Sequence, residues 1–179
     1  MRLIRPADFR TQPWKNGGGI THEIARADRG GRLLWRLSIA EVASDGPFSA
    51  FPGLSRILTV IEGAGLYLDT PGGRLDALPL APLAFSGDLP VQSRLIGGPI
   101  RDFNLIYDGR HLQASVTLVR DRLPECPPAP QAFHALLALA GALPGIGLEA
   151  GALGFSEQFD ACRCPGFAGL LATFEPVAP

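Results

Sequence analysis

Residues 35–40, Trp-Arg-Leu-Ser-Ile-Ala, alternate large apolar side chains with polar or small ones at a period of two. Because successive side chains of a β-strand point to opposite faces, the three large apolar residues would share one face of such a strand. Arg36 and Ser38 would then project from the other face. The segment predicts a β-strand with one apolar face and one face that carries a guanidinium and a hydroxyl group.

Short runs of the same kind follow along the chain and predict an all-β fold. Residues 57–61 are rich in β-branched side chains, and a glycine-containing loop at 62–65 separates them from an apolar run at 66–68, which predicts a hairpin. The 22 glycines and 17 prolines are spread through the sequence and leave little room for long helices. This spacing is typical of a barrel or a sandwich. Further strands are expected at residues 83–86, 91–96, 101–107 and 113–119.

A proline-rich segment predicts the domain boundary. Residues 124–130 read Pro-Glu-Cys-Pro-Pro-Ala-Pro. Proline lacks the backbone N–H group that a strand ladder needs, so this segment is expected to be an extended connector. We therefore expect a first barrel over residues 1–123, a connector over residues 124–131, and a degenerate second half over residues 132–179 that packs on the first.

The second half repeats features of the first half. Residues 137–142 resemble residues 59–64, and residues 153–156 resemble residues 83–86, which indicates a degenerate duplication. Residues 132–143 are rich in alanine and leucine and could instead form a helix, because these residues favour helices and the run is long enough. A strand is the preferred interpretation, because Gly141 suits a turn and would cost a helix about 1 kcal/mol.

Composition bears on the partners and the location of the protein. The formal net charge is -1, and no cluster of lysine and arginine provides the positive surface that binding to nucleic acid requires. The longest apolar stretches, such as residues 135–143, are too short to span a bilayer, and residues 1–6 lack the apolar region of a signal peptide. We expect a cytoplasmic protein with neither a nucleic acid nor a membrane as partner.

The cysteines and histidines do not form a recognisable metal site. Cys162 and Cys164 are one residue apart and Cys126 lies alone, whereas a structural zinc site needs about four ligands. The motifs G-x-S-x-G of serine hydrolases and G-x-x-x-x-G-K-[ST] of phosphate loops are also missing. The sequence therefore predicts no metal, no cofactor and no catalytic residue. The three histidines are isolated from one another: His22, His111 and His134.

Five longer strings lie in the first 105 residues: 13–23 (Pro-Trp-Lys-Asn-Gly-Gly-Gly-Ile-Thr-His-Glu), 35–42, 45–53, 85–88 and 98–104. In this order they resemble the HutD/Ves family. The resemblance implies a cupin-like barrel, an RmlC-like jelly roll, duplicated as a bicupin. It also implies a link to histidine utilisation and the binding of a small product of histidine degradation such as formylglutamate, with no established enzymatic reaction. After residue 104 the chain departs from the family by reading Leu-Ile-Tyr-Asp, where a methionine and a basic residue are common.

Polar residues of two expected strands are the main candidates for a ligand site. Arg36 and Ser38 share one strand face, and Asp102 and Asn104 share a face of another. If both faces line a barrel interior, arginine can bind a carboxylate bidentately while the aspartate and asparagine bind amide or amine groups. The alternatives are a structural ion pair between Arg36 and Asp102, or exposure of these side chains to solvent.

Two further groups are candidate ligand contacts. Lys15, Asn16 and Gly17 begin a Lys-Asn-Gly-Gly-Gly run. Its lysine and backbone N–H groups would face an anionic ligand at a barrel mouth, or the run would be an Asn-Gly hairpin turn with an exposed lysine. Thr21 and Glu23 share one strand face, which would belong to the pocket or to an outer polar surface.

These observations leave three classes of function open. The resemblance favours a regulatory protein that binds a small carboxylate and modulates histidine catabolism, with a homodimer as one possible assembly. The alternative is a metal-independent cupin enzyme, an isomerase or hydrolase in which Asp102 or Glu23 acts as general base. A structural or interaction module would instead have an interior filled by its own side chains.

Overall fold

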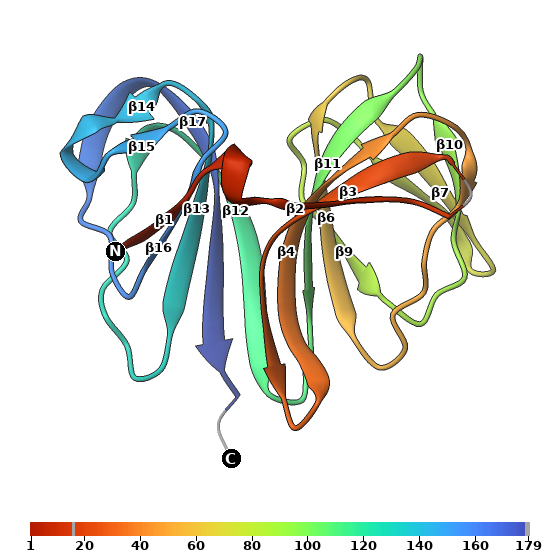
Figure 1. The fold of residues 1–179 in the computed structure, drawn as a ribbon, viewed down its shortest axis with the longest axis horizontal. Helices are drawn as coiled ribbons and strands as arrows, with labels where there is room; N and C mark the ends of the chain where they lie inside the picture. Colours follow the sequence, from red (N-terminus) through yellow and green to blue (C-terminus); the bar gives the residue numbers. More distant parts are fainter. Residues whose placement is uncertain (16, 178–179) are drawn as a thin grey trace. The chain divides into compact units, whose positions relative to one another are not determined.

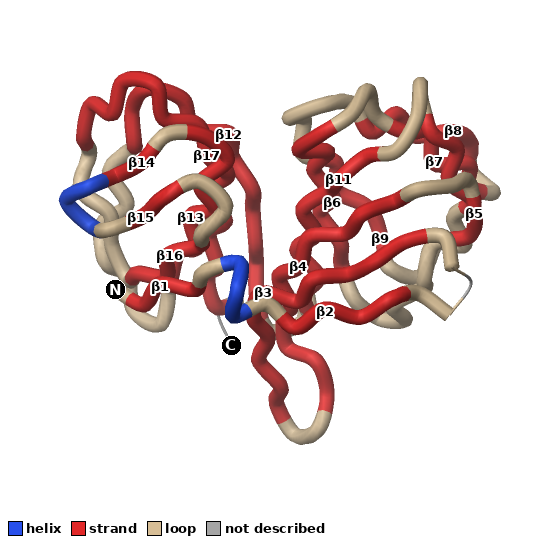
Figure 2. Tube along the Cα trace, turned by 45° about the horizontal axis from the view of Figure 1, so that its top comes forward, coloured by secondary structure: helices blue, strands red, loops and turns tan. Residues whose placement is uncertain are grey.

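Almost every regular element of the computed structural model, which describes residues 1–15 and 17–177, is a β-strand (Figures 1 and 2). The chain divides into two compact β units. The first β unit is Arg10–Asp108, and the second β unit combines Met1–Phe9 with Gly109–Pro179. The expected all-β class is confirmed by this content of strands.

The first β unit is built on a six-stranded antiparallel sheet in the order β2-β3-β4-β11-β6-β9. The alternating segment at residues 35–40 lies inside β4, and three of the other runs predicted from the sequence lie in β6, β9 and β11. The six strands are β2 (Arg10–Pro13), β3 (Gly19–Arg29), β4 (Arg32–Val42), β11 (Ile100–Tyr107), β6 (Ser55–Glu62) and β9 (Leu83–Ser86).

A second sheet of this unit has the order β5-β10-β7-β8. Leu58 and Val60 of the six-stranded sheet belong to the same buried cluster as Leu66 and Leu68 of the four-stranded sheet. Burial of this shared apolar surface is the main force that holds the two sheets together. The strands of the second sheet are β5 (Gly46–Pro47), β10 (Gln92–Leu95), β7 (Leu66–Thr70) and β8 (Gly73–Ala77).

The hairpin predicted between residues 57–61 and 66–68 is wrong. β6 and β7 are both strands, but β6 pairs with β11 and β9, whereas β7 pairs with β8 and β10. The loop at 62–65 therefore carries the chain from one sheet to the other. Two successive apolar runs around glycines are compatible with both arrangements, because strands of facing sheets bury their apolar sides in the same core.

The second β unit contains a five-stranded sheet in the order β1-β16-β13-β17-β12 and the short pair β14-β15. The alanine- and leucine-rich stretch forms β13, so the preference for a strand over a helix is confirmed. The expected strand at 113–119 lies inside β12. The strands are β1 (Arg2–Ile4), β16 (Leu153–Ser156), β13 (Phe133–Ala140), β17 (Cys162–Pro176), β12 (Leu112–Leu123), β14 (Ala142–Leu143) and β15 (Leu148–Glu149).

The two compact units differ from the domains expected at 1–123 and 132–179. β12 pairs along its length with β17, and β1 pairs with β16, so both ends of the expected first domain belong to the second β unit. The proline-rich connector at 124–131 consequently joins β12 to β13 inside that unit. Prolines indicate where the hydrogen bonding between strands stops, but they do not indicate which strands the flanking segments pair with.

Corresponding strands of the two units match in detail. β6 and β13 each have eight residues with the same sequence of buried and exposed positions, and each pairs on one side with the strand that carries the second repeated stretch. Gly63 and Gly141 follow them with φ angles of 93° and 71°. A Cβ atom at Gly63 would lie 2.8 Å from the carbonyl oxygen of Pro99, and one at Gly141 would lie 2.6 Å from that of Gly166. A duplication accounts for this match, and it stays a prediction.

The helical content of the described residues is limited to two single 3₁₀ turns, at Pro6–Asp8 and Pro144–Ile146. Neither segment is long enough to cross a membrane.

Candidate ligand-binding site

Four strands of the six-stranded sheet bring the candidate polar residues to one face. On β11, Asn104 lies opposite Ser38 of β4 and Leu58 of β6, and Asp102 lies opposite Ala40 and Val60. Residues directly opposite each other in an antiparallel pair have their side chains on the same face. The polar residues therefore project from the face that carries the apolar cluster shared with the second sheet.

A small pocket opens on this face. Its polar lining includes two arginines, Arg36 of β4 and Arg56 of β6. Aromatic rings form much of the remaining wall, so cations and apolar surface are combined in a small space. The other polar side chains of the lining are Thr21, Ser38, Ser49 and Asn104, and the aromatic ones are Trp14, Phe48 and Phe51.

The guanidinium group of Arg36 is held loosely at the pocket. Its Nη2 atom is 3.5 Å from Oγ of Ser38, and its centre lies 5.5 Å from the centre of the Phe51 ring. Its Nε atom is buried and donates no hydrogen bond to any of the described residues. Burial lowers the pKa of Arg36, and the nearby charge of Glu23 partly opposes this shift. The Nε atom faces Glu23, and the Nη2 contact with Ser38 is long, so Arg36 can bind an anion without first breaking a strong bond.

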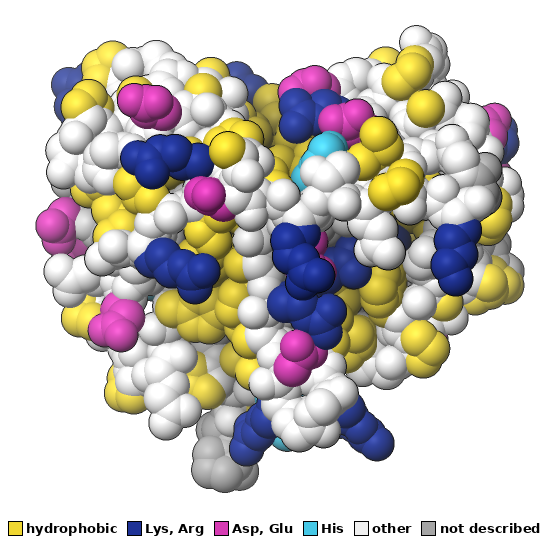
Figure 3. Space-filling model, in the orientation of Figure 1, with side chains coloured by type: hydrophobic (Ala, Val, Ile, Leu, Met, Phe, Trp, Pro, Cys, Tyr) yellow, Lys and Arg dark blue, Asp and Glu magenta, His cyan; other side chains and the backbone are white. Residues whose placement is uncertain are grey.

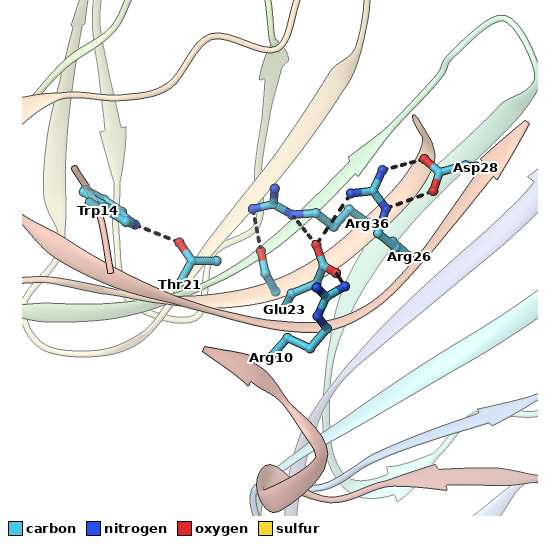
Figure 4. Close-up of polar contacts among 8 residues, drawn as sticks. Arg10, Trp14, Thr21, Glu23, Arg26, Asp28 and Arg36 are labelled. Atoms are coloured by element: carbon cyan, nitrogen blue, oxygen red, sulfur yellow. Dashed lines mark hydrogen bonds and ion pairs between the residues drawn. The ribbon is translucent and has the colours of Figure 1, made fainter. Parts of the chain in front are cut away.

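Three arginines, including Arg36 itself, surround the carboxylate of Glu23 (Figure 4). Arg10, Arg26 and Arg36 approach its oxygens at 3.9, 4.0 and 3.9 Å, all beyond direct hydrogen-bond distance. Arg26 also forms a closer ion pair with Asp28, at 2.5 Å. Glu23 therefore gives Arg36 only weak compensation of charge, and excess positive charge remains beside the pocket. On the face seen in Figure 3, both basic and acidic side chains are present.

The second arginine of the pocket, Arg56, is 8% exposed and belongs to a buried polar chain. Its Nε and Nη2 atoms donate to Oδ1 of Asn104 at 2.9 and 2.5 Å. The Nδ2 atom of Asn104 in turn donates to Oδ1 of Asp102. The Arg56 guanidinium also lies 4.8 Å from the ring centre of Phe48 and 5.5 Å from that of Phe85, a geometry suited to cation–π attraction.

Burial strongly perturbs the acid-base properties of this chain. It lowers the pKa of Arg56 to about 10, although the charge of Asp102 opposes the shift. It raises the pKa of Asp102 to about 6, against the opposing effects of the Arg56 charge and the Asn104 hydrogen bond. The Oδ2 atom of Asp102 accepts no hydrogen bond from the described residues. The carboxyl group is thus close to changing its charge near neutral pH.

The residues predicted from the sequence are only partly brought together. Arg36, Ser38, Asn104 and Thr21 line the pocket. Asp102 is fully buried behind Asn104 and does not reach the lining. The suggested ion pair between Arg36 and Asp102 does not occur among the described residues, since the acidic partner of Arg36 is Glu23.

The glycine-rich run forms the turn of a β2–β3 hairpin. Lys15 and Gly17 are exposed there, and Gly17 has a φ angle of 72° and donates its N–H to the carbonyl oxygen of Trp14 at 3.1 Å. Neither residue is part of the pocket lining. Asn16 lies outside the described residues. The exposure of Lys15 and the hydrogen bond of Gly17 agree with the turn interpretation, and a contact with a ligand stays a prediction.

Arg56 and the aromatic wall of the pocket were not predicted from the sequence. A signal for Arg56 was present, because it lies two residues before Leu58 in a β-branched run and so shares a face with Leu58 and Val60. A charged residue that shares a strand face with core positions is unusual, and it needs a buried partner. The wall residues Phe48 and Phe51 lie in a loop, where no strand periodicity predicts which way their side chains point.

Comparison with known proteins identifies the family. A sequence profile described as HutD matches residues 6–158. The chain belongs to the HutD family. The structure of HutD from Pseudomonas fluorescens SBW25 is 34% identical, with a TM-score of 0.79 and 99% of each chain covered. A bacterial pirin from Escherichia coli, solved in complex with nickel(II), is 9% identical with a TM-score of 0.66, and shares the fold alone. The cupin-like fold expected from the sequence is confirmed by these matches.

A curated relative of this HutD family member comes from Pseudomonas putida. It is described as an uncharacterized 21.2 kDa protein in the hutC 3′ region and is 47% identical over 118 residues. These residues make up 64% of this chain and 62% of the relative.

Within residues 1–15 and 17–177, no group of three or more histidine, cysteine, aspartate or glutamate side chains is arranged to hold a metal ion.

Proposed function

We propose that this chain binds a small carboxylate, such as formylglutamate, in the pocket of the first β unit and thereby regulates histidine catabolism in the cytoplasm. The observation that carries the proposal is the presence of Arg36 and Arg56 in one small pocket with aromatic walls. Pockets for small molecules combine apolar walls with a few polar groups that fix orientation. Two guanidinium groups in such a setting favour an anionic ligand over a neutral or cationic one.

The surroundings of the two arginines support complementary roles for them in this function. Arg36 makes only a long contact with Ser38 and a distant ion pair with Glu23, so we assign it the bond to the ligand carboxylate. Arg56 is bound on one side to Asn104, and we assign it a fixed positive field at the base of the pocket. The membership in the HutD family and the hutC context of a relative support the link to histidine utilisation.

A thermal-shift experiment with four candidate ligands tests this function. Histidine, urocanate, formylglutamate and glutamate are added separately to the purified protein, with glutamine as a matched control for glutamate that lacks the side-chain charge. A ligand present at 100 times its dissociation constant should stabilise the protein by about 2.7 kcal/mol. We expect formylglutamate to raise the melting temperature and glutamine to leave it unchanged. Unchanged melting temperatures with all four ligands would argue strongly against the proposed function.

A further inference from the structure

The chain Arg56–Asn104–Asp102 connects the pocket to a carboxyl group that the ligand cannot touch. Asp102 is 0% exposed, and Asn104, which lines the pocket, lies between it and Arg56. Nδ2 of Asn104 points to Asp102 and Oδ1 points to Arg56, so the carboxylate determines which way the amide is turned. A reversed amide would direct its NH₂ group at the guanidinium, and the contact with Arg56 would be lost.

We propose that Asp102 is a positioning residue for this pocket, acting through Asn104 on Arg56, and that binding of an anion beside Arg56 is accompanied by the uptake of a proton at Asp102. The inference rests on the proposed function, since it concerns the same pocket and its anionic ligand. It goes further by linking ligand affinity to pH through a group that makes no contact with the ligand.

The electrostatic surroundings of Asp102 explain the coupling. Its compensating positive charges on the same face are Arg56 of β6 and, farther away, Arg36 of β4, while Glu23 of β3 adds a negative charge. The four-stranded sheet contributes uncharged side chains to this core, such as Leu66, Leu68 and Ser93. An anion bound beside Arg56 competes with Asp102 for the same positive charge. Because Asp102 is buried and its Oδ2 atom lacks a partner, protonation relieves this competition.

The sign of the effect follows from linkage. Burial raises the pKa of Asp102 to about 6 in the free protein, and a bound anion raises it further. Below pH 6, Asp102 is protonated with or without ligand, so affinity should be high and nearly constant. Above pH 6, binding requires one proton, so affinity should fall by up to roughly tenfold per pH unit until the pKa of the complex is passed.

Isothermal titration calorimetry with formylglutamate measures this proton directly. Titrations of the wild-type protein at pH 7 in two cationic buffers with different heats of ionisation give the number of protons taken up, without a buffer anion that competes for the pocket. We expect an uptake of up to one proton per ligand in the wild type. The variant Asp102→Asn retains a carbonyl acceptor for Asn104, and it should bind with no dependence on pH between 6 and 8.

The matched control is Asp76→Asn, which changes an exposed aspartate of β8 that pairs with Arg74. It should keep both the affinity and the proton uptake of the wild type. Binding without proton uptake in the wild type, or an unchanged uptake in Asp102→Asn, would overturn the inference and leave the proposed function standing. If Asp102→Asn does not fold, the wild-type calorimetry and the change of affinity between pH 6 and 8 still decide it. A complete absence of binding would overturn the proposed function together with this inference.

Discussion

Replacing Arg56 by methionine is expected to lower the free energy of unfolding of the first β unit by about 3–5 kcal/mol at pH 8. Methionine keeps much of the apolar volume of the arginine stem, but it removes the positive charge that compensates the buried carboxylate of Asp102. It also leaves Oδ1 of Asn104 without its donors. Urea unfolding followed by tryptophan fluorescence measures the change, because both tryptophans, Trp14 and Trp35, belong to this unit.

The loss of stability in Arg56→Met should depend on pH in a definite direction. The pKa of Asp102 in the folded protein lies above its value in an unfolded chain, so folding favours its protonated form. The stability that this group contributes is therefore complete at low pH and is lost as the pH rises through the folded-state pKa. We expect Arg56→Met to be much less destabilised at pH 5 than at pH 8. The double variant Arg56→Met/Asp102→Asn should recover most of the stability at pH 8, because it leaves no buried charge.

The matched control for this prediction is Arg74→Met. Arg74 is a strand arginine that forms an ion pair with Asp76 at 2.8 Å and lies 4.2 Å from the ring centre of Tyr67, but it is exposed. Exposed pairs contribute about 0–1 kcal/mol, so this variant should be nearly as stable as the wild type. Equal losses in Arg56→Met and Arg74→Met would contradict a buried, charge-compensated role for Arg56.

The second large effect is expected on binding rather than on stability. Arg36→Met should weaken the affinity for formylglutamate by roughly 10- to 150-fold, which corresponds to about 1.5–3 kcal/mol for a lost charged hydrogen-bond donor. Its effect on stability should be small, because Glu23 keeps Arg10 and Arg26 as ion-pair partners. Calorimetric titration of both proteins measures the difference in affinity.

The binding experiment with Arg36→Met also has a matched control and a result that would contradict it. Arg74→Met, which removes the same charge from the four-stranded sheet, should bind formylglutamate like the wild type. An unchanged affinity in Arg36→Met would show that the carboxylate is bound elsewhere, and the assignment of Arg36 as the main anion ligand would then be wrong.

Local patterns were sufficient to predict the strands and the shared face of the site. A period of two placed Arg36 and Ser38 on one face, and the register of β4 with β11 brings them to the face of Asn104, as expected. The strand at Phe133–Ala140 was also predictable, because the glycine that ends it argued against a helix. These features depend on neighbours in sequence, which a single chain reveals directly.

Features that depend on distant pairing were not predictable in the same way. Nothing in residues 57–68 distinguishes a hairpin from a crossing between two sheets. The assignment of β1 and β12 to the second β unit depends on their pairing with β16 and β17, far away along the chain. The buried partner of Arg56 was unpredictable for a similar reason, because Asn104 is 48 residues away in sequence.

A crystal structure of the protein with formylglutamate is the most direct test of the central claim that the pocket of the first β unit binds a small carboxylate. We predict a ligand carboxylate about 2.7–3.2 Å from guanidinium nitrogens of Arg36, between the rings of Trp14 and Phe51. A ligand bound outside this pocket, or a complex in which side chains fill the pocket, would contradict the claim.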